Sequence, residues 1–330
     1  MTTRLTSLVA LALAGAFLFG CGDDDAGPVG VDMGAGSDLG PVTPICPSDA
    51  PAPDNQMGAC CWRASNATRL DAPELRLAAL RLTAPMGSTL TSPILRGILN
   101  KSFDGERFNW LIQATGAPTT GNGPVTIRTG YGERATNGTF AFTMGEAPAP
   151  GDVNRWDPIT VTGTMTGETI STPASDGAVP LTIPVFDEAD PTLLVVELPV
   201  FGLELVNAPL SEDRSCIGLR NTTSYTTADG GDLRAYIRVE DARTRMVVVP
   251  PSLSATLCAV IAGSLTMSTY CDMPQSEWLA KPNSLCNATG CEANTVGATD
   301  VCDPTMSGAG GCNAWELLGE FAAQGVDITN

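Results

Sequence analysis

The sequence contains no histidine among its 330 residues, and this absence excludes many kinds of chemistry. Ser-His-Asp and Cys-His nucleophile systems, HExxH metalloproteases and histidine-ligated metal centres all need an imidazole. EF-hand, GxGxxG, Walker-type phosphate-loop and G-x-S-x-G motifs are absent from the sequence as well. Asp and Glu are the only abundant acid–base groups. We expect no cofactor and no metal.

Basic and aromatic residues are scarce. Lys and Arg number 18 against 36 Asp and Glu, so the formal net charge is −18. This charge opposes binding to nucleic acid and to anionic lipid headgroups. Aromatic residues make up only 5% of the chain, whereas Gly (35) and Pro (25) are plentiful, which favours many turns over long helices. No nucleic-acid partner is expected.

The hydrophobic run that opens the chain is short. It comprises the twelve residues from Leu8 to Phe19 and follows Arg4. As a helix it would cover about 18 Å, less than the roughly 30 Å of a bilayer core, so residues 1–20 are predicted to be a signal peptide. The ending Leu18-Phe19-Gly20-Cys21 resembles the bacterial lipobox, although Phe19 is bulkier than the residue usual there.

The lipobox resemblance implies that Cys21 becomes the mature N-terminus and carries two or three acyl chains, which make membrane anchoring durable. It also implies a place in the bacterial cell envelope, in the outer membrane or at the cell surface rather than in the inner membrane. The alternative is an ordinary cleaved signal with a coincidental cysteine. Residues 22–45 carry five aspartates and no basic residue, so residues 21–45 are predicted to be a lipidated cysteine with a disordered acidic tether.

Cysteine arithmetic agrees with lipidation. Eleven cysteines leave one unpaired in an oxidising compartment, and assigning Cys21 to lipid leaves an even ten. Zinc or iron–sulfur ligation is the alternative to disulfides, but no CxxC pair occurs and thiols oxidise outside the cytoplasm. Connectivity cannot be deduced, although sequence neighbours such as Cys286 and Cys291 are plausible partners. The disulfide candidates are Cys46, Cys60, Cys61, Cys216, Cys258, Cys271, Cys286, Cys291, Cys302 and Cys312.

Residues 46–210 are predicted to form a β-rich domain. Two-residue alternation in "TFAFTM", "ITVTGTMTG" and "RFNWLIQ" is typical of strands with one face on a core. "LTIPVF" and "TLLVVELPVFGLELV" predict further strands, the second interrupted near Pro199 or Gly202. "ELRLAALRL" fits either a helix or a bulged strand, and we favour the strand. One helix is expected in "TSPILRGILNKSF", capped by Ser92.

Residues 211–330 are predicted to form a cysteine-rich region of loops and helices, packed on the β-rich domain or continuous with it. Short helices are expected in "VEDARTRMVVV" and in "SLSATLCAVIAG", the second ending at Gly263. Asn313 is expected to cap a last helix in "NAWELLGEFAAQGVDI". The fold class is therefore mainly β with a few helices (α+β): an antiparallel β-sandwich or barrel-like core with a disulfide-rich, partly helical C-terminal region.

Some features of the sequence could serve a ligand, and each has a plain structural alternative. The threonines of residues 160–166 could meet a carbohydrate, but threonine also has high β propensity. Tyr131 between glycines could stack on a ligand, or belong to a hairpin. Paired carboxylates could bind calcium or act as acid and base, or could be solvated turns. The carboxylate candidates are Asp187, Glu188, Asp190, Glu240 and Asp241.

Three functions remain open. The first is a non-catalytic binding or structural module of the envelope, anchored in the membrane through Cys21, with an envelope protein or a glycan as partner. The second is a carboxylate-based hydrolase acting on polysaccharide, which needs two facing carboxyl groups about 5–9 Å apart. The third is a carrier of lipid or other apolar molecules, which needs an apolar cavity. The organisation resembles that of surface lipoproteins of social and predatory soil or marine bacteria, and transfers no catalytic residue.

Overall fold

The computed structural model covers the whole chain, and the part described here comprises residues 64–93, 96, 99, 102–103, 106–143, 156–175, 180–186, 193–220, 225–226, 230–249, 253–264, 269–295 and 299–329. All of these residues belong to one contact unit, Leu39–Asn330. Cys21, Cys46, Cys60, Cys61 and the acidic turn at 187–190 lie outside the described residues. In the described part of the chain, no helix has the length and apolar character needed to cross a membrane.

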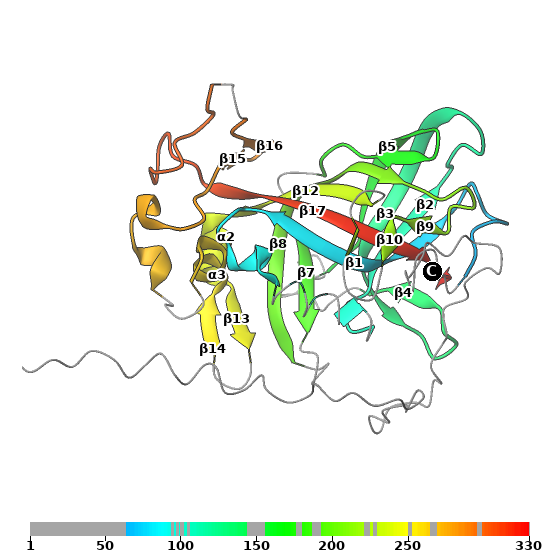
Figure 1. The fold of residues 1–330 in the computed structure, drawn as a ribbon, viewed down its shortest axis with the longest axis horizontal. Coiled ribbons are helices and arrows are strands. Elements are labelled where there is room, and N and C mark those ends of the chain that lie inside the picture. The colour runs from blue at the N-terminus through cyan, green and yellow to red at the C-terminus, as the bar shows by residue number, and fades with distance from the viewer. Residues whose placement is uncertain are drawn as a thin grey trace, which may run out of the picture. The chain divides into compact units, whose positions relative to one another are not determined.

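The centre of the fold is a closed ring of antiparallel strands, and the expected mainly β class is confirmed. Each strand pairs with the next, and the first pairs with the last, so the sheet is a barrel. Figure 1 shows β17 (red) between β12 and β1, which closes the ring. In ring order the strands are β1 (Glu74–Ala84), β2 (Trp110–Thr115), β3 (Asn122–Arg134), β5 (Ile159–Thr166), β6 (Thr169–Ser171), β8 (Leu194–Pro209), β12 (Gly231–Arg238) and β17 (Ala314–Gly325).

Shorter strands extend this ring. β7 (Leu181–Phe186) pairs with the first half of β8, and β9 (Cys216–Ile217) pairs with the end of β17. The remaining strands are β4 (Phe140–Phe142) with β3 and with β18 (Ile328–Thr329), β15 (Ser284–Asn287) with β16 (Gly290–Ala293), β10 (Leu219–Arg220) with β11 (Tyr225–Thr226), and β13 (Met246–Val249) with β14 (Leu253–Thr256).

The helices are short. Pro93 and the described residues that follow it up to Phe103 are helical, as expected for that segment, and the amide of Arg96 donates to the carbonyl of Ser92 (3.1 Å). Gly263 ends a helix in the left-handed conformation (φ 113°), which also agrees with the prediction. The other helical elements are α2 (Val239–Thr244), α3 (Leu257–Ala262) and the 3₁₀ turns η1 (Thr89–Thr91), η3 (Tyr270–Asp272) and η4 (Gln275–Glu277).

Alternation places the apolar side chains inside the barrel. Along β5 the odd-numbered residues face inward while Thr160, Thr162, Thr164 and Thr166 are exposed, as predicted. β1 is the bulged strand that its leucines indicated, since its register against β17 shifts between Leu77 and Ala79. The bulge reverses the sides on which odd and even residues lie, so that leucines on both sides of it pack on the same core.

The predicted C-terminal helix is wrong. Residues 314–325 form β17, which pairs with both β1 and β12, and Trp315, Leu317 and Phe321 alternate toward the interior. The segment contains good helix formers, but pairing with β12 along its first part and with β1 along its last part, together with a buried face, outweighs that weak preference. The other two C-terminal predictions are half right, because α2 is followed by β13 and α3 is preceded by β14, and these two strands form a hairpin.

The described cysteines confirm the disulfide prediction in part. Three bridges are present, Cys258–Cys271, Cys286–Cys291 and Cys302–Cys312, all within the C-terminal region. Cys286 and Cys291 lie directly opposite each other on β15 and β16. The first bridge joins α3 to η3, and the third closes the loop that precedes β17. Each bridge limits the freedom of the unfolded chain in a region that is rich in loops.

The two ends of the barrel have different character. At one end Arg214, which is buried, donates to the carbonyls of Leu70 and Pro118 (2.7 Å to Pro118) and pairs with Glu168 (2.8 Å). At the other end, near Thr129 and Ile159, six aromatic rings form a continuous cluster. These rings are Phe103, Phe108, Trp110, Tyr131, Trp156 and Phe186, and we call them the aromatic cluster.

Candidate functional site

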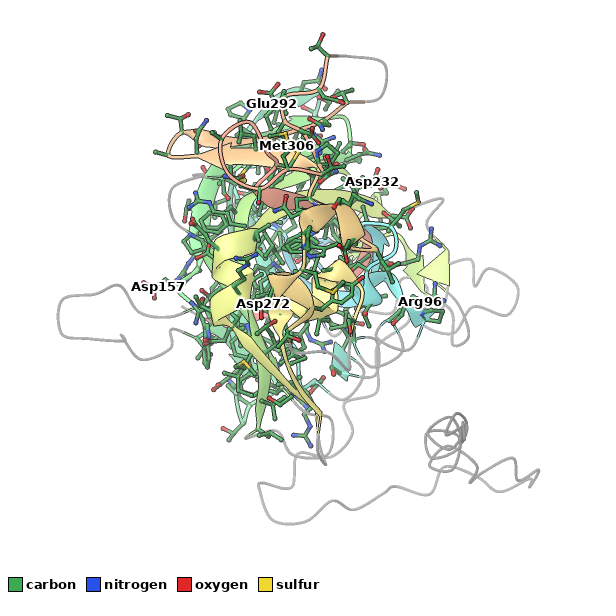
Figure 2. All side chains as sticks on the ribbon, turned by 90° about the vertical axis from the view of Figure 1, so that its left-hand side faces the viewer. Arg96, Asp157, Asp232, Asp272, Glu292 and Met306 are labelled. Atoms are coloured by element: carbon green, nitrogen blue, oxygen red, sulfur yellow. A yellow bond between two sulfur atoms is a disulfide. The ribbon has the colours of Figure 1, made fainter. Side chains whose placement is uncertain are left out.

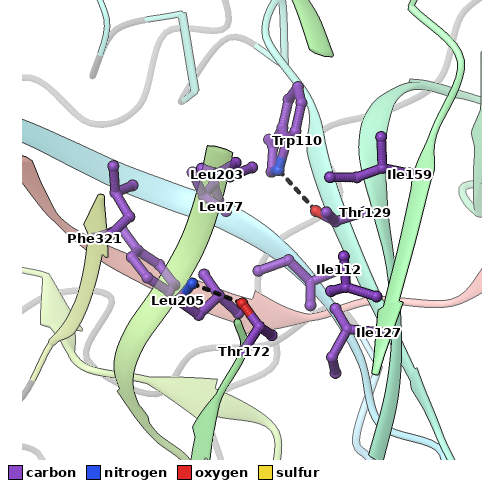
Figure 3. A pocket seen from close by; sticks show the side chains of 12 residues that line it. Leu77, Trp110, Ile112, Ile127, Thr129, Ile159, Thr172, Leu203, Leu205 and Phe321 are labelled. Carbon is purple, nitrogen blue, oxygen red and sulfur yellow. Dashed lines mark hydrogen bonds between the residues drawn. The ribbon is translucent and has the colours of Figure 1, made fainter. Parts of the chain in front are cut away.

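The candidate site is an apolar pocket inside the barrel (Figure 3). Its volume is about 40 Å³. Most strands of the ring contribute side chains to its wall. The lining residues are Leu77, Trp110, Ile112, Ile127, Thr129, Ile159, Val161, Thr172, Leu203, Leu205, Leu233 and Phe321.

A bulge in β8 directs two of the lining leucines into the pocket. β8 pairs with β12 so that Phe201 lies opposite Tyr236 and Glu204 lies opposite Arg234, which leaves one extra residue in β8 between these pairs. Gly202 takes the left-handed conformation there (φ 56°), which glycine adopts without strain. The extra residue places the side chain of Phe201 on the outer face of the barrel, in a buried cluster with Tyr236, and the side chain of Leu203 inside the barrel. The sequence predicted an interruption near Pro199 or Gly202, but β8 is continuous through both positions, and the bulge at Gly202 is the feature that shapes this wall.

Two threonines are the only polar residues among the twelve that line the pocket. Thr129 is fully engaged, since its Oγ1 accepts from Trp110 Nε1 (2.8 Å) and donates to the carbonyl of Leu111 (2.8 Å). Thr172 Oγ1 accepts from the amide of Leu205 (2.9 Å). Figure 3 shows these side chains on different walls of the pocket. The pocket therefore has a largely apolar surface with a single pair of hydroxyl groups.

The aromatic cluster adjoins the pocket through Trp110, which belongs to both. Tyr131 is only 5% exposed and contacts Phe108, Trp156 and Phe186. Burial, with a smaller contribution from Glu133, raises the pKa of Tyr131 from 10.0 to about 12. The sequence left open whether Tyr131 stacks on a ligand or belongs to a hairpin. Its ring is packed against other aromatic rings, and β3 and β4 form a hairpin there, so the structure favours the second reading.

Trp156 connects the aromatic cluster to Glu197 of β8 and, through it, to Arg245 after α2. Its Nε1 donates to Glu197 Oε1 (3.1 Å), and Glu197 Oε2 pairs with Arg245 Nη1 (3.2 Å). The backbone of Trp156 has a positive φ (65°), which is uncommon for a residue with a large side chain. The ring of Trp156 also contacts Phe186 of β7 edge to face. These contacts hold the rings of β3 and β7 together at the aromatic end.

The predicted carboxylates do not meet at the pocket. Glu240 and Asp241 lie in the first turn of α2, and neither is among the lining residues. Burial raises the pKa of Asp241, the neighbouring Glu240 raises it further, and Arg238 and Arg245 oppose this. Asp187, Glu188 and Asp190 lie outside the described residues. Where the structure describes the chain, no group of three or more Cys, Asp and Glu side chains could hold a metal ion.

A different set of acidic residues gathers on the outer face of β8, β12 and β17, where sequence reasoning had pointed to nothing. Arg234 pairs with Glu204 (2.8 Å) and with Glu316 (3.1 Å). Burial raises the pKa of Glu316, while Arg234 lowers it. Because the guanidinium pairs with both carboxylates and offsets part of their charge, this group ties three adjacent strands together. It lacks the two freely facing carboxyl groups that a glycosidase needs.

Exposed apolar side chains offer no aromatic platform for a glycan. In the described ranges the exposed large apolar residues are all aliphatic or methionine, and the most exposed are Met86 (83%) and Leu279 (68%). Figure 2 shows Met306 at the upper end of that view, on the side where Glu292 of β16 lies. The others are Val206, Met246, Val248 and Leu285, which belong to β8, β13 and β15.

Comparison of the chain with family models, with curated protein sequences and with solved structures finds no match. The functional argument therefore depends on the residues of this chain. Cys21 and the tether lie outside the described residues, so lipidation stays a prediction. The pocket itself had no signature in the sequence, because its residues look like ordinary core positions until the ring of strands closes around them.

Proposed function

We propose that this protein binds a small, uncharged, apolar molecule in the pocket of its barrel, without catalysing a reaction on it. The observation that carries the proposal is the pocket wall: ten apolar side chains and two threonines inside a closed ring of eight strands. Barrels of eight strands have an interior that side chains almost fill, which leaves room for one small ligand at most. An apolar wall of this kind favours a ligand that gains by leaving water.

The composition of the wall favours binding over catalysis. None of the twelve lining residues can act as a general acid or base near neutral pH, because the wall contains no acidic, basic or cysteine side chain. Thr129 is held by two hydrogen bonds and has no base beside it among the lining residues. Of the three functions that the sequence left open, binding of an apolar molecule has the most structural support, and a carboxylate-based hydrolase has the least.

The size of the pocket limits the part of the ligand that enters. A volume of 40 Å³ holds roughly three water-sized groups, since one such group needs about 10–15 Å³ of this volume. One edge of a small ring or the end of a short chain has these dimensions. A whole ring or a lipid does not fit inside, so a larger ligand would leave its remaining atoms outside the pocket.

The N-terminal sequence supports a proposal for where this binding occurs. We propose that lipid on Cys21 anchors the mature chain in the bacterial cell envelope, at the outer membrane or the cell surface, with the acidic tether as a spacer. The net charge of −18 supports this arrangement, because repulsion holds the folded part away from anionic headgroups. An envelope protein or a glycan stays an alternative partner for the outer surface.

The experiment uses the mature chain from residue 21 with Cys21→Ser, labelled with ¹³C at isoleucine methyl groups, and methylenecyclohexane as the probe. Ile112, Ile127 and Ile159 line the pocket, whereas Ile261 lies in α3 and reports non-specific effects. We expect saturable shifts of the three lining methyl resonances and none for Ile261. A filled pocket, Leu203→Phe, abolishes these shifts, whereas Leu285→Phe on the exposed face of β15 keeps them. Absence of shifts in the unfilled chain contradicts the proposal.

A further inference from the structure

We propose that Thr172 is the residue that selects the ligand, by donating its hydroxyl hydrogen to an oxygen atom of the bound molecule. The inference depends on the proposed function, since it concerns the same pocket. It assigns the ligand class: an uncharged apolar molecule that carries a carbonyl or ether oxygen, as opposed to a pure hydrocarbon or an acid. Three features of the structure support this assignment.

The first feature is the position of the Thr172 hydroxyl in a row of hydrogen bonds that joins backbone and side-chain groups of two neighbouring segments. The segment after β6 runs beside β8, and the amides of Thr172 and Ser175 donate to the carbonyls of Leu205 (2.8 Å) and Leu203 (2.9 Å). In return the amides of Leu205 and Leu203 donate to the side-chain oxygens of Thr172 and Ser175 (2.9 Å each). The hydroxyl oxygen of Thr172 therefore takes the place of a backbone acceptor, and its position is held by the strand pairing.

The second feature is the unused hydrogen of that hydroxyl. A threonine hydroxyl can donate one hydrogen bond and accept others. Thr172 Oγ1 accepts from Leu205, but among the described residues it donates to none, whereas Thr129 both donates and accepts. Because the amide of Leu205 occupies one side of the oxygen, the hydrogen must lie on another side. A donor at the edge of an apolar pocket is best satisfied by an acceptor on the ligand.

The third feature is the absence of charge in the wall. A carboxylate ligand could also accept from Thr172, but burial of an anion without a cationic partner is costly, and the lining residues include no arginine or lysine. A hydrocarbon would leave the hydroxyl hydrogen without a partner once it had displaced water. A carbonyl or ether oxygen satisfies the hydroxyl at little cost in desolvation, and the rest of such a molecule suits the apolar wall.

The position of Thr172 at the pocket depends on Gly163 of β5, because the segment of Thr172 passes close to this residue. A Cβ atom at position 163 would lie 2.6 Å from the carbonyl oxygen of Ser171 and 3.1 Å from Thr172 Cγ2. Any side chain there would push the segment away from β5. Glycine at this position therefore allows Thr172 to form part of the pocket wall. We expect Gly163→Ala to weaken binding of the ligand, because it displaces Thr172.

The test compares two probes of equal shape, cyclohexanone and methylenecyclohexane, on the mature Cys21→Ser chain and on its Thr172→Val and Thr172→Ser variants. The ratio of the two dissociation constants is measured for each protein, and comparing this ratio between proteins cancels the difference in hydration between the probes. We expect Thr172→Val to lower the preference for the ketone by about three- to tenfold, the usual worth of one neutral hydrogen bond. Thr172→Ser, which keeps the hydroxyl, should retain the preference.

The outcomes separate this inference from the proposed function. If both probes bind and Thr172→Val leaves the ratio of their dissociation constants unchanged, whether or not it weakens both, Thr172 has a structural role only. That result overturns the inference and leaves the proposed pocket standing. If neither probe shifts the lining methyl resonances of the chain with Thr172 intact, both proposals fail. Should Thr172→Val not fold, the carbonyl stretching frequency of bound cyclohexanone decides: it is expected below its value in hexane, and an unshifted band overturns the inference.

Discussion

Glu74 connects three segments that are far apart in the sequence. Its Oε2 accepts from Arg69 Nη1 (2.7 Å) and from the amide of Ile328 (2.7 Å), and its Oε1 accepts from Gln113 Nε2 (2.9 Å). Asn66, which is fully buried, adds hydrogen bonds to the carbonyls of Glu74 (3.1 Å) and Arg214 (2.7 Å). A buried network in which these polar groups are satisfied specifies one arrangement of the chain, because any other would leave them unpaired.

Tyr131 gives a test of the aromatic cluster by pH. Its pKa is about 12 in the folded chain and 10.0 without burial, so between these values the folded state holds the proton more tightly than the unfolded state. The free energy of unfolding therefore falls as the pH rises from 10 to about 12. We expect Tyr131→Phe, which keeps the ring, to make the fall in melting temperature over this range shallower. Identical declines in both proteins, followed by circular dichroism, would contradict the buried position of the hydroxyl.

At the scale of elements, β12 and β17 pack closely where Gly231, which has no side chain, faces Phe321. A Cβ atom at Gly231 would lie 2.5 Å from two ring atoms of Phe321, its partner in the ladder. Phe321 is buried and lines the pocket, so it has little room to move. The glycine therefore allows a large aromatic ring to fill this part of the barrel.

We expect Gly231→Ala to destabilise the fold by about 1–3 kcal/mol, the usual cost of overpacking a core. It should also change the shifts that methylenecyclohexane causes, because Phe321 must turn into the pocket. Gly123→Ala in β3 is the matched control: its Cβ would make an ordinary contact of 3.5 Å with Pro118. Chemical denaturation of both variants measures the difference. Equal stability of the two would show that the ring of Phe321 gives way without cost.

At the scale of the whole molecule, strands from both predicted regions complete one barrel. β12 and β17 belong to residues 211–330, and the other six strands of the ring belong to residues 46–210. The long ladder between β1 and β17 joins two segments separated by more than two hundred residues. Every strand of this ring has a neighbour on both sides, although β1 pairs with β2 only over Glu74–Arg76, and this arrangement limits pairing with other chains.

Anchoring is tested on the whole chain. We expect metabolic labelling with an alkyne fatty acid to tag the wild-type protein, and Cys21→Ser to remove the tag, because the cysteine thiol is the atom that would receive the lipid. Fractionation of the same cells should move the protein from the membrane fraction to the soluble envelope fraction in the variant. A wild-type chain that is acyl-free with its leader intact in the cytosol refutes both the anchor and the compartment.

Local patterns in the sequence determined the mainly β class, four of the eight strands of the ring (β1, β2, β5 and β8), the bulge in β1, the stop at Gly263 and the exposed threonines of β5. These features depend on alternation and on the conformations open to glycine, which act over a few residues. Of the three disulfide pairs, only Cys286–Cys291 was singled out from the sequence, as plausible partners, and the cysteines of the other two could be named only as members of a set. The C-terminal strand was mistaken for a helix because its leucines and alanines suit a helix when no neighbouring strand is considered.

Tertiary structure alone decided the closure of the ring, the identity of β17 and the existence of the pocket. The pocket residues come from strands spread over most of the described chain, and inward-facing residues of a sandwich and of a barrel alternate in the same way. Only the pairing of β1 with β17 makes them the wall of one pocket. A cavity is the space that packed side chains leave between them, so it has no pattern along the chain and follows from distances that the fold sets.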